Sequence, residues 1–168
     1  MTPERACANV QAQTKKESMM LVVFDIDGTL ANIEHRLAFV RSKPKNWPAF
    51  DAGIPNDAVN PYVAEAFHSL KAAGNEIIFA SGRSERTRDA TMKWLQDNRF
   101  WNYTAKLYMR KADDFRSDDI VKREILDEIV ADWGRKPDMV FDDRPRVVRM
   151  WREEGIFVFN VYQGEEDF

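Results

Sequence analysis

The sequence has little of several features that would by themselves assign the protein to a class. Its 168 residues include one cysteine, Cys7, so no internal disulfide can form, which suits a reducing compartment. No apolar run is long enough to cross a membrane, and the N-terminus lacks the apolar core of a signal peptide. The net charge is only −3, so the overall composition does not demand a nucleic-acid partner. We therefore expect a cytoplasmic protein without a membrane partner, in which any binding of a polyanion needs a local basic patch.

The composition and the order of its apolar segments indicate a globular α/β domain. Hydrophobic residues make up 44% and charged residues 32% of a chain whose length fits one domain. Residues 1–18 are polar and without a clear period, so we expect a flexible extension before a single domain over 19–168. Apolar runs alternate with amphipathic segments, which predicts a parallel sheet with right-handed helical crossovers.

The periodicity and the turn residues give approximate bounds for these elements. Strands are expected at 21–24, 76–80, 105–109, 138–141 and 156–161. Helices are expected at 34–41, 61–73, 84–98, 118–133 and 146–154. Residues 42–60 contain three prolines, a glycine and two aromatic side chains, which predicts an irregular, partly packed loop.

The first strand runs directly into the segment Asp25-Ile26-Asp27-Gly28-Thr29. Side chains two residues apart on a strand point the same way, so Asp25 and Asp27 can face one spot at its carboxyl end. Two adjacent carboxylates repel each other and need a cation or a chemical task to justify them. We interpret Asp25 as a candidate nucleophile and Asp27 as a candidate general acid and base.

A second acidic pair, Asp142 and Asp143, follows the strand expected at 138–141. The carboxyl ends of parallel strands lie at one edge of a sheet, where such folds place their active sites. Oxygen ligands of this kind favour Mg²⁺. We expect Asp25 and Asp142 as direct ligands, Asp143 as a ligand through water, and Asp27 as a ligand through its main-chain oxygen. The alternative is that the second pair forms only a turn or a helix cap.

Two further segments can supply groups that bind a phosphate. Ser81-Gly82-Arg83 follows the strand at 76–80 and is expected to open a helix, where hydroxyl, N–H groups and helix dipole favour an anion. The alternative is that Ser81 and Gly82 only cap the helix and that Arg83 is a solvated surface cation. Lys122 lies near the start of a helix, where a cation is unfavourable, so a role beside Asp25 and a phosphate would explain it. Its alternative is an exposed lysine paired with an aspartate one turn earlier.

Together these residues describe phosphoryl transfer through an aspartyl intermediate. In this hypothesis Asp25 attacks phosphorus, and Asp27 protonates the leaving oxygen and then deprotonates the water that hydrolyses the intermediate. A magnesium ion, Ser81 and Lys122 would stabilise charge on the transferring group.

The ordered motifs around Asp25, Ser81, Lys122 and Asp142 resemble those of the haloacid dehalogenase superfamily of phosphatases. The resemblance covers roughly residues 20–162. It implies a Rossmannoid three-layer sandwich, a five-stranded parallel sheet of order 5-4-1-2-3, and dependence on magnesium.

A narrower resemblance connects the chain to the 3′-phosphatase domain of phage polynucleotide kinase-phosphatases. It rests on residues 116–125, on residues 141–152 and on the closing glycine and acidic tail. Two features depart from that domain. No glycine-rich kinase loop occurs in this sequence, and residues 33–57 form a longer, more aromatic insertion, which we expect to be a small cap.

The resemblance implies a phosphorylated nucleic-acid end as the substrate, but other readings stay open. The alternatives are a phosphatase for nucleoside monophosphates or other small phosphoesters, and a non-catalytic phosphate-binding module. Trp47 and Phe50 either stack on a base or, in our preferred reading, pin the insertion to the body. His35 is expected at the surface. Basic residues expected near the site, which either bind backbone phosphates or form surface ion pairs, are Arg83, Arg86, Arg88, Arg110, Lys111, Arg116 and Arg144.

Overall fold

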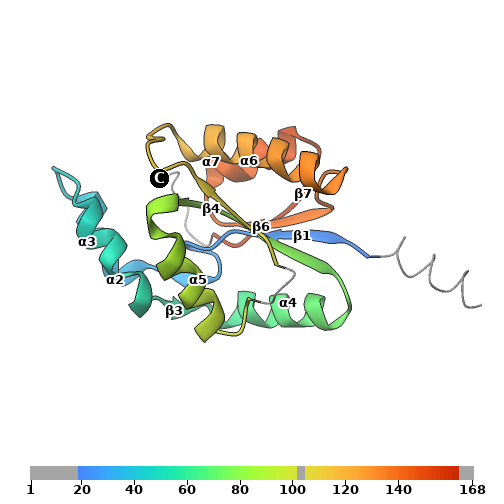
Figure 1. Ribbon diagram of the computed structural model, residues 1–168, viewed down its shortest axis with the longest axis horizontal. Coiled ribbons are helices and arrows are strands. Elements are labelled where there is room, and N and C mark those ends of the chain that lie inside the picture. The colour runs from blue at the N-terminus through green and yellow to red at the C-terminus, as the bar shows by residue number, and fades with distance from the viewer. Residues whose placement is uncertain (1–18, 102–104, 163–168) are drawn as a thin grey trace, which may run out of the picture.

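The computed structural model describes residues 19–101 and 105–162, drawn in colour in Figure 1. The extension expected at 1–18, with Cys7, and the closing acidic tail lie outside the described residues. The main sheet consists of β1 (Leu21–Phe24), β4 (Glu76–Ser84), β5 (Leu107–Arg110), β6 (Met139–Asp142) and β7 (Phe157–Asn160). All of its neighbouring strands pair in parallel, as the alternating sequence pattern predicts.

The strand order across the sheet is β5-β4-β1-β6-β7, with β1 at the centre. The labels differ from the expected 5-4-1-2-3 because two short strands, β2 (Ala31–Asn32) and β3 (Ala58–Val59), form a separate antiparallel pair. Counted within the main sheet alone, the order is the expected one read from the opposite edge. Phe24, the last residue of β1, lies opposite Phe79 of β4 and Phe141 of β6, so β1 and β6 end almost side by side next to β4, which continues to Ser84.

Helices cover both faces of the sheet and form a three-layer sandwich (Figure 1). The helices are α2 (Glu34–Arg41), α3 (Trp47–Ala52), α4 (Pro61–Ala72), α5 (Arg88–Asp97), α6 (Asp118–Trp133) and α7 (Pro145–Glu153). Two short 3₁₀ helices, η1 (Ile54–Asn56) and η2 (Glu85–Thr87), complete the described elements. The helix expected to begin at residue 84 is therefore divided into η2 and α5. None of the described helices is long and apolar enough to span a membrane.

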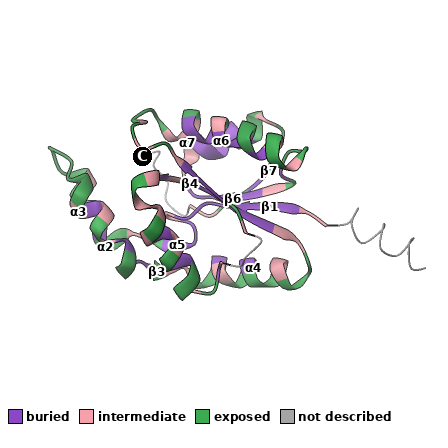
Figure 2. Cartoon of the chain, viewed as in Figure 1, coloured by how far each residue is buried: buried purple, intermediate pink, exposed green. Residues whose placement is uncertain are grey.

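The core explains why the first strand is apolar on both faces. Leu21 and Val23 pack in a cluster with residues of α6 and α7, whereas Val22 and Phe24 pack in a second cluster with residues of α4 and α5. None of the four side chains is exposed to solvent. Figure 2 shows the central strands as buried and the outer helix faces as exposed. Alternate side chains of β1 thus fill the two halves of the core, which holds β1 and its carboxyl end in place.

The insertion is more ordered than the sequence predicts. Instead of an irregular loop over 42–60, the chain forms α3, η1 and β3, and α2 and α3 project together from one end of the molecule (Figure 1). The side chain of Asn46 caps α3 by accepting a hydrogen bond from the main-chain N–H of Ala49 at 3.1 Å. Pro48 lies in the first turn of α3, where its missing N–H costs nothing. The expectation of a loop was wrong because prolines were read as helix breakers.

Candidate active site

Three carboxylates meet where β1 and β6 end. Asp25 follows β1 directly, and its main-chain N–H donates to the carbonyl of Phe141, 3.0 Å away on β6. This bond places Asp25 beside Asp142 and Asp143. Each of the three carboxylates offers an oxygen within 4.8 Å of those of the other two. All three residues are at least nine-tenths buried, so their mutual repulsion is poorly screened by water.

Lys122 connects two of these carboxylates. Its Nζ atom donates to Asp25 Oδ1 at 2.6 Å and to Asp142 Oδ2 at 2.7 Å, and only 3% of the residue is exposed. The alternative of an exposed lysine paired with a nearby aspartate of α6 is therefore wrong. The position near the start of α6, unfavourable in an isolated helix, is explained by two buried carboxylates that outweigh the helix dipole.

Burial and mutual repulsion dominate the electrostatics of this cluster. Burial raises the pKa of Asp25 to about 6; Lys122 opposes the increase and the charge of Asp142 adds to it. Burial and the charges of Asp25 and Asp142 raise the pKa of Asp143 well above its usual range. Burial by itself would lower the pKa of Lys122, but Asp142 and Asp25 outweigh it and keep the ammonium charged. The cluster therefore holds one cation against three acids and favours a further positive charge.

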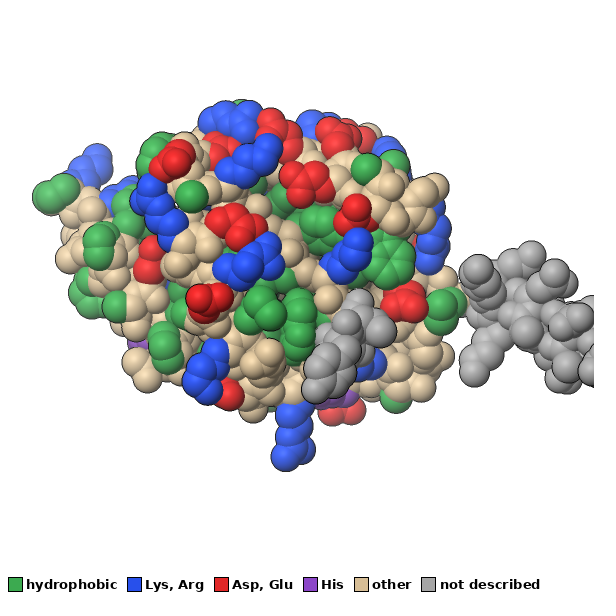
Figure 3. Space-filling view, viewed as in Figure 1, with side chains coloured by type: hydrophobic (Ala, Val, Ile, Leu, Met, Phe, Trp, Pro, Cys, Tyr) green, Lys and Arg blue, Asp and Glu red, His purple; other side chains and the backbone are tan. Residues whose placement is uncertain are grey.

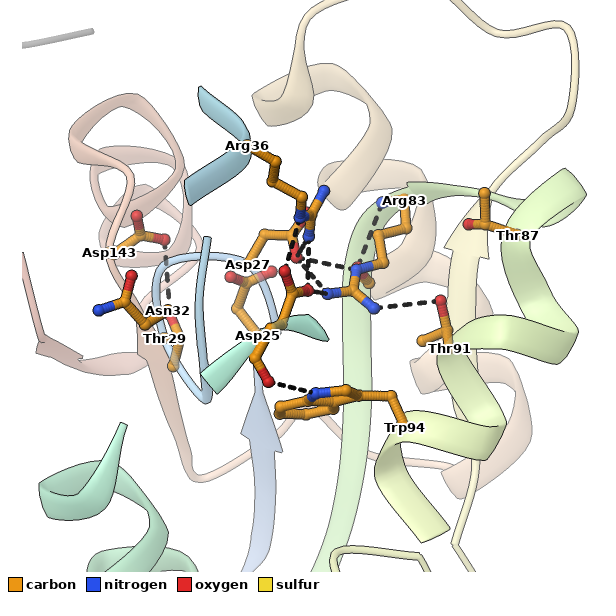
Figure 4. Close-up of polar contacts among 12 residues, drawn as sticks. Asp25, Asp27, Thr29, Asn32, Arg36, Arg83, Thr87, Thr91, Trp94 and Asp143 are labelled. Atoms are coloured by element: carbon orange, nitrogen blue, oxygen red, sulfur yellow. Dashed lines mark hydrogen bonds and ion pairs between the residues drawn. The ribbon is translucent and has the colours of Figure 1, made fainter. Parts of the chain in front are cut away.

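The turn after β1 is shaped around Asp143. Gly28 has φ +84°, and a Cβ atom there would lie 2.1 Å from Asp143 Oδ2. The neighbouring Thr29 hydroxyl donates to Asp143 Oδ1 at 3.4 Å, a contact drawn in Figure 4. Residue 28 must be glycine for two reasons: its backbone is left-handed, and the carboxylate of Asp143 lies too close for a side chain.

The side chain of Asp27 points toward two arginines, Arg36 and Arg83 (Figure 4). Its Oδ1 atom accepts from Arg36 Nη2 at 2.7 Å and from Arg83 Nε and Nη2 at 2.8 and 2.5 Å. Burial alone would raise the pKa of Asp27, but Arg83 and Arg36 together hold it below the usual range. All three bonds end on one oxygen. The side chain is 21% exposed.

Asp57 holds the two arginines in place from their other side. It accepts from Arg36 at 2.7 and 2.8 Å and from Arg83 at 2.7 Å, while its main-chain carbonyl accepts from the Trp94 indole at 2.8 Å. The half-exposed His35 also contacts Asp57, at 2.9 Å. These residues form a buried network of alternating charges that links the insertion to β1, β4 and α5.

Sequence reasoning did not single out Asp57, and it treated Arg36 only as part of an unusual insertion. Arg36 is fully buried, and its partners Asp27 and Asp57 lie nine and 21 positions away in the chain. No local pattern marks such a pair, because neither spacing corresponds to a helix or strand repeat. The sequence held one weak indication that Arg36 is buried, because this residue lies on a face of α2 that also carries apolar residues.

The segment from Ser81 to Arg83 differs from its prediction. It belongs to β4 rather than to a helix start, and the pairing with β5 shifts register between Ser81 and Ser84, so Gly82 and Arg83 form a bulge. Arg83 is not a solvated surface cation but is 6% exposed and bound to Asp27 and Asp57. Ser81 is fully buried and accepts from the main-chain N–H of Arg83 at 3.2 Å. An anion site built on a helix dipole is therefore not formed by these residues, because α5 starts only at Arg88.

Several of the basic residues expected near the site form ion pairs with nearby acids. These pairs are Arg86–Asp113, Arg88–Glu85, Arg110–Asp118, Arg116–Asp114, Arg116–Glu124 and Arg144–Asp118. The reading as an ion-paired surface therefore describes much of this set better than the reading as an open phosphate-binding patch. Arg110 also donates to the carbonyl of Gly82 at 2.9 Å and so ties the end of β5 to the bulge in β4.

The sheet order, together with buried carboxylates at the ends of its central strands, defines a phosphatase of the haloacid dehalogenase superfamily. Residues 19–168 match the family described as "Polynucleotide kinase PNKP phosphatase domain", and the chain belongs to that family. The resemblance seen in the sequence is thereby confirmed.

Two similar proteins are longer than this chain. It is 32% identical over 150 residues to a protein of Autographa californica nuclear polyhedrosis virus provisionally named a bifunctional polynucleotide kinase/RNA ligase. That alignment covers 88% of this chain and 20% of the viral protein. A chain in the solved structure of the Pnkp1/Rnl/Hen1 complex is 30% identical with a TM-score of 0.71, and the match covers 89% of this chain and 48% of that one.

A more distant structure shares the fold alone. It is a haloacid dehalogenase-like hydrolase from Streptococcus pneumoniae, 14% identical with a TM-score of 0.61, and the match covers 90% of this chain and 88% of that one. The chain thus spans nearly the whole of this hydrolase but less than half of the relatives that are more similar in sequence.

Proposed function

We propose that this chain is a magnesium-dependent phosphomonoester hydrolase that works through an aspartyl-phosphate intermediate and removes 3′-phosphates from polynucleotide ends. The observation that carries the proposal is the convergence of Asp25, Asp142 and Asp143 around Lys122 at the carboxyl edge of the sheet. A structural cluster would gain nothing from holding three buried acids so close together, whereas a metal-dependent phosphatase needs them.

The donor set fits a hard divalent cation. It offers only carboxylate oxygens, and Lys122 neutralises part of their charge. A bound Mg²⁺ would supply charge neutralisation for the phosphoryl oxygens and would lower the raised pKa of Asp25 and Asp143. Asp25, Asp142 and Asp143 would hold the ion through their side chains, and Asp27 through its main-chain oxygen.

Asp25 is the proposed nucleophile. Its oxygen attacks phosphorus, the bond from phosphorus to the leaving oxygen breaks, and the phosphoryl group becomes an acyl phosphate on Asp25. Lys122 donates to Asp25 Oδ1, so it holds the carboxylate in one orientation and can stabilise the transferring charge. The Ser81 hydroxyl and the main-chain N–H of Gly82 are the proposed partners of the phosphoryl oxygens.

Asp27 is the proposed general acid and base. The two arginines bind only its Oδ1 atom, which leaves Oδ2 to carry the proton. Because the arginines lower the pKa of Asp27, it is poised as a base in the free protein, and an incoming phosphate dianion would raise its pKa. Asp27 then protonates the leaving oxygen and later takes a proton from the water that hydrolyses the acyl phosphate.

The choice of a polynucleotide end rests on the family and on the size of the cap. The description of the family names the phosphatase domain of a polynucleotide kinase, and a similar viral protein is named as a polynucleotide kinase and RNA ligase. The cap helices α2 and α3 have only eight and six residues, which suits a site that a long strand can enter. The 3′-hydroxyl end left by the reaction would then pass to activities such as the polynucleotide kinase and RNA ligase named for the viral relative.

The decisive experiment compares kcat/KM under magnesium for three substrates. They are an oligonucleotide with a 3′-phosphate, the same oligonucleotide with a 5′-phosphate, and the 3′-mononucleotide. We expect the first to be turned over with the highest kcat/KM. Equal or higher values for the mononucleotide would overturn the polynucleotide assignment in favour of the nucleotide phosphatase. No turnover of any of the three would contradict the proposed activity itself.

A further inference from the structure

The end of the cap combines basic and aromatic side chains. We define the cap tip as residues 39–48, which join α2 to the first turn of α3. This segment carries Arg41, Lys43 and Lys45 and no acidic residue, although the whole chain has a net charge of −3. Phe39 and Trp47 are 41% and 50% exposed in the same segment. Figure 3 shows blue and green side chains together at this projecting end of the molecule.

The structure separates the two aromatic residues that the sequence could not distinguish. Phe50 is 8% exposed, and its ring faces the Arg36 guanidinium at 4.1 Å, so this residue packs inside the cap against the arginine that binds Asp27. Trp47 meets Phe50 edge to face, with ring centroids 5.8 Å apart, and keeps half of its surface in solvent. Trp47 is thus not needed to seal the core, and its exposed indole surface remains available for a ligand.

The exposed indole has a fixed relation to the chemistry. Trp47 packs on Phe50, Phe50 on Arg36, and Arg36 donates to Asp27 at 2.7 Å. Each step in this series is a direct contact between side chains, and the two middle residues, Phe50 and Arg36, are buried. A base bound at Trp47 would therefore stand at a defined distance from the carboxylate that protonates the leaving oxygen.

The neighbours of Trp47 point to a nucleic acid rather than to another protein. Lys45 Nζ lies 5.4 Å from the centroid of the Trp47 ring, and Lys43 is exposed two residues earlier. Protein interfaces are depleted in lysine at their centres, so an exposed tryptophan flanked by lysines fits such an interface poorly. Single-stranded nucleic acid offers both matching groups, a flat base for the indole and a phosphate for each ammonium.

We propose that the cap tip is a binding site for the single-stranded nucleotides that precede the terminal 3′-phosphate. Trp47 stacks on one base, and Lys43 and Lys45 bind the backbone phosphates on either side of it. This inference rests on the proposed function and adds the contact that lets the enzyme prefer a strand over a mononucleotide.

The test measures a ratio of two kcat/KM values, one for a 3′-phosphorylated oligonucleotide and one for p-nitrophenyl phosphate. We expect Trp47→Ala to lower this ratio about tenfold, which corresponds to about 1.4 kcal/mol of lost stacking, and Trp47→Phe to retain most of it. The matched control is Phe157→Ala. Phe157 is 64% exposed at the start of β7, the strand end opposite to the site, and its variant should leave the ratio unchanged.

The proposed phosphate contacts of Lys43 and Lys45 are tested by a separate measurement, the salt dependence of KM. Replacement of Lys43 and Lys45 by glutamine should weaken the salt dependence of KM for the oligonucleotide, since two fewer counterions are released on binding. An unchanged salt dependence would contradict the phosphate contacts.

Two other outcomes would overturn the proposal and leave the proposed function intact. One is an unchanged ratio in Trp47→Ala while the wild-type enzyme still prefers the oligonucleotide. The other is a loss confined to Phe115→Ala, which would place the strand over the loop after β5, where Phe115 is 84% exposed. A wild-type enzyme that shows no preference for the oligonucleotide over the 3′-mononucleotide would instead refute the polynucleotide assignment made under the proposed function.

Discussion

At the scale of single residues, the site divides its acids into two environments with opposite effects. Asp25 and Asp143 sit among other carboxylates, which together with burial raises the pKa of both. Asp27, two residues from Asp25, sits between two arginines that lower its pKa. The different environments of Asp25 and Asp27 support the different roles proposed for them, Asp25 as the nucleophile and Asp27 as the acid and base.

The proposed role of Asp25 as the nucleophile leads to the first prediction. Asp25→Asn should reduce turnover of any phosphomonoester at least about a thousandfold, because an amide cannot form the acyl phosphate. The fold should persist, since the amide has nearly the same shape and loses one of three repelling charges. Circular dichroism and thermal unfolding check the fold, and a steady-state assay checks turnover. The matched control is Asp97→Asn, an exposed residue of α5 paired with Lys93. Activity of Asp25→Asn at the level of this control would refute the assignment of Asp25 as the nucleophile.

Asp57 carries the second prediction. Its carboxylate is fully buried and binds both arginines that hold Asp27. Asp57→Asn leaves two buried guanidinium groups with one carboxylate between them, so we expect a loss of about 3–5 kcal/mol in the free energy of unfolding. The value of kcat should also fall, because Arg36 and Arg83 no longer have a fixed position. Urea unfolding measures the first effect, with Asp97→Asn as the control that should change stability little. If the free energy of unfolding of Asp57→Asn equalled that of the wild type, the network of Asp57 with Arg36 and Arg83 would not stabilise the fold.

The residue scale also shows where sequence reasoning ends. Asp25, Asp27, Asp142 and Asp143 could be found because each pair follows a recognisable apolar strand. The contact of Lys122 with Asp25 could be anticipated only from an unfavourable place in a helix. Asp57 could not be found, because its partners come from three other elements and no spacing relates them. Burial of a charge is a property of the assembled fold, and local sequence does not record it.

At the scale of elements, apolar runs predicted strands better than breaker residues predicted loops. All five strands of the main sheet were expected within a few residues of their bounds, since each is an apolar run between polar turns. The exception is β4, which continues through Ser84 because a bulge lets it keep pairing with β5. Helix α3 was missed because the prolines and Gly53 around it suggested a loop, whereas Pro48 lies in the first turn of the helix and Gly53 is its C-cap.

The turn after β1 gives the third prediction, which separates backbone strain from a steric clash. Gly28→Ala and Gly74→Ala both place a side chain on a left-handed backbone, with φ values of +84° and +89°. Each should cost roughly 1–2 kcal/mol of stability. Only Gly28→Ala adds a Cβ atom against Asp143, whereas the new Cβ at residue 74 meets nothing within 4 Å.

We therefore expect Gly28→Ala to lose most of its kcat and Gly74→Ala to keep it. Chemical unfolding and steady-state kinetics on the same two proteins check this. An unreduced kcat in both variants would mean that the position of Asp143 does not matter for turnover, and a similar loss of kcat in both would mean that backbone strain alone is responsible.

At the scale of the whole molecule, the fold delivers residues from distant parts of the chain to one edge. Asp25, Lys122 and Asp142 are separated by up to 117 positions, and parallel pairing of β1 with β6 brings them together. The sequence predicted this meeting because an alternating pattern implies a parallel sheet, and a parallel sheet has a single carboxyl edge. It did not predict how the cap packs, because a short insertion has no repeat from which packing can be inferred.

The last prediction is that the stability of the folded molecule depends on the proposed metal, because the fold brings the three carboxylates together. Treatment with EDTA should abolish hydrolysis, and added Mg²⁺ should restore it. Because the three buried carboxylates repel one another, bound Mg²⁺ should also stabilise the fold itself, by about 2.7 kcal/mol at a concentration of 100 times Kd. For a domain of this size that corresponds to a rise in Tm of roughly 5–10 °C. Differential scanning calorimetry of the EDTA-treated protein, with and without Mg²⁺, measures this directly.

The matched variant for this experiment is Asp143→Asn. It removes one proposed ligand and leaves both hydrogen bonds of Lys122 in place, since those go to Asp25 and Asp142. We expect its Tm without Mg²⁺ to equal or exceed that of the wild type, because one repelling charge is gone, and its increase with Mg²⁺ to be smaller. A Tm that does not respond to Mg²⁺ in the wild type, together with hydrolysis that survives EDTA, would remove the metal from the mechanism. The three acids would then need a different explanation, with Lys122 as their counterion.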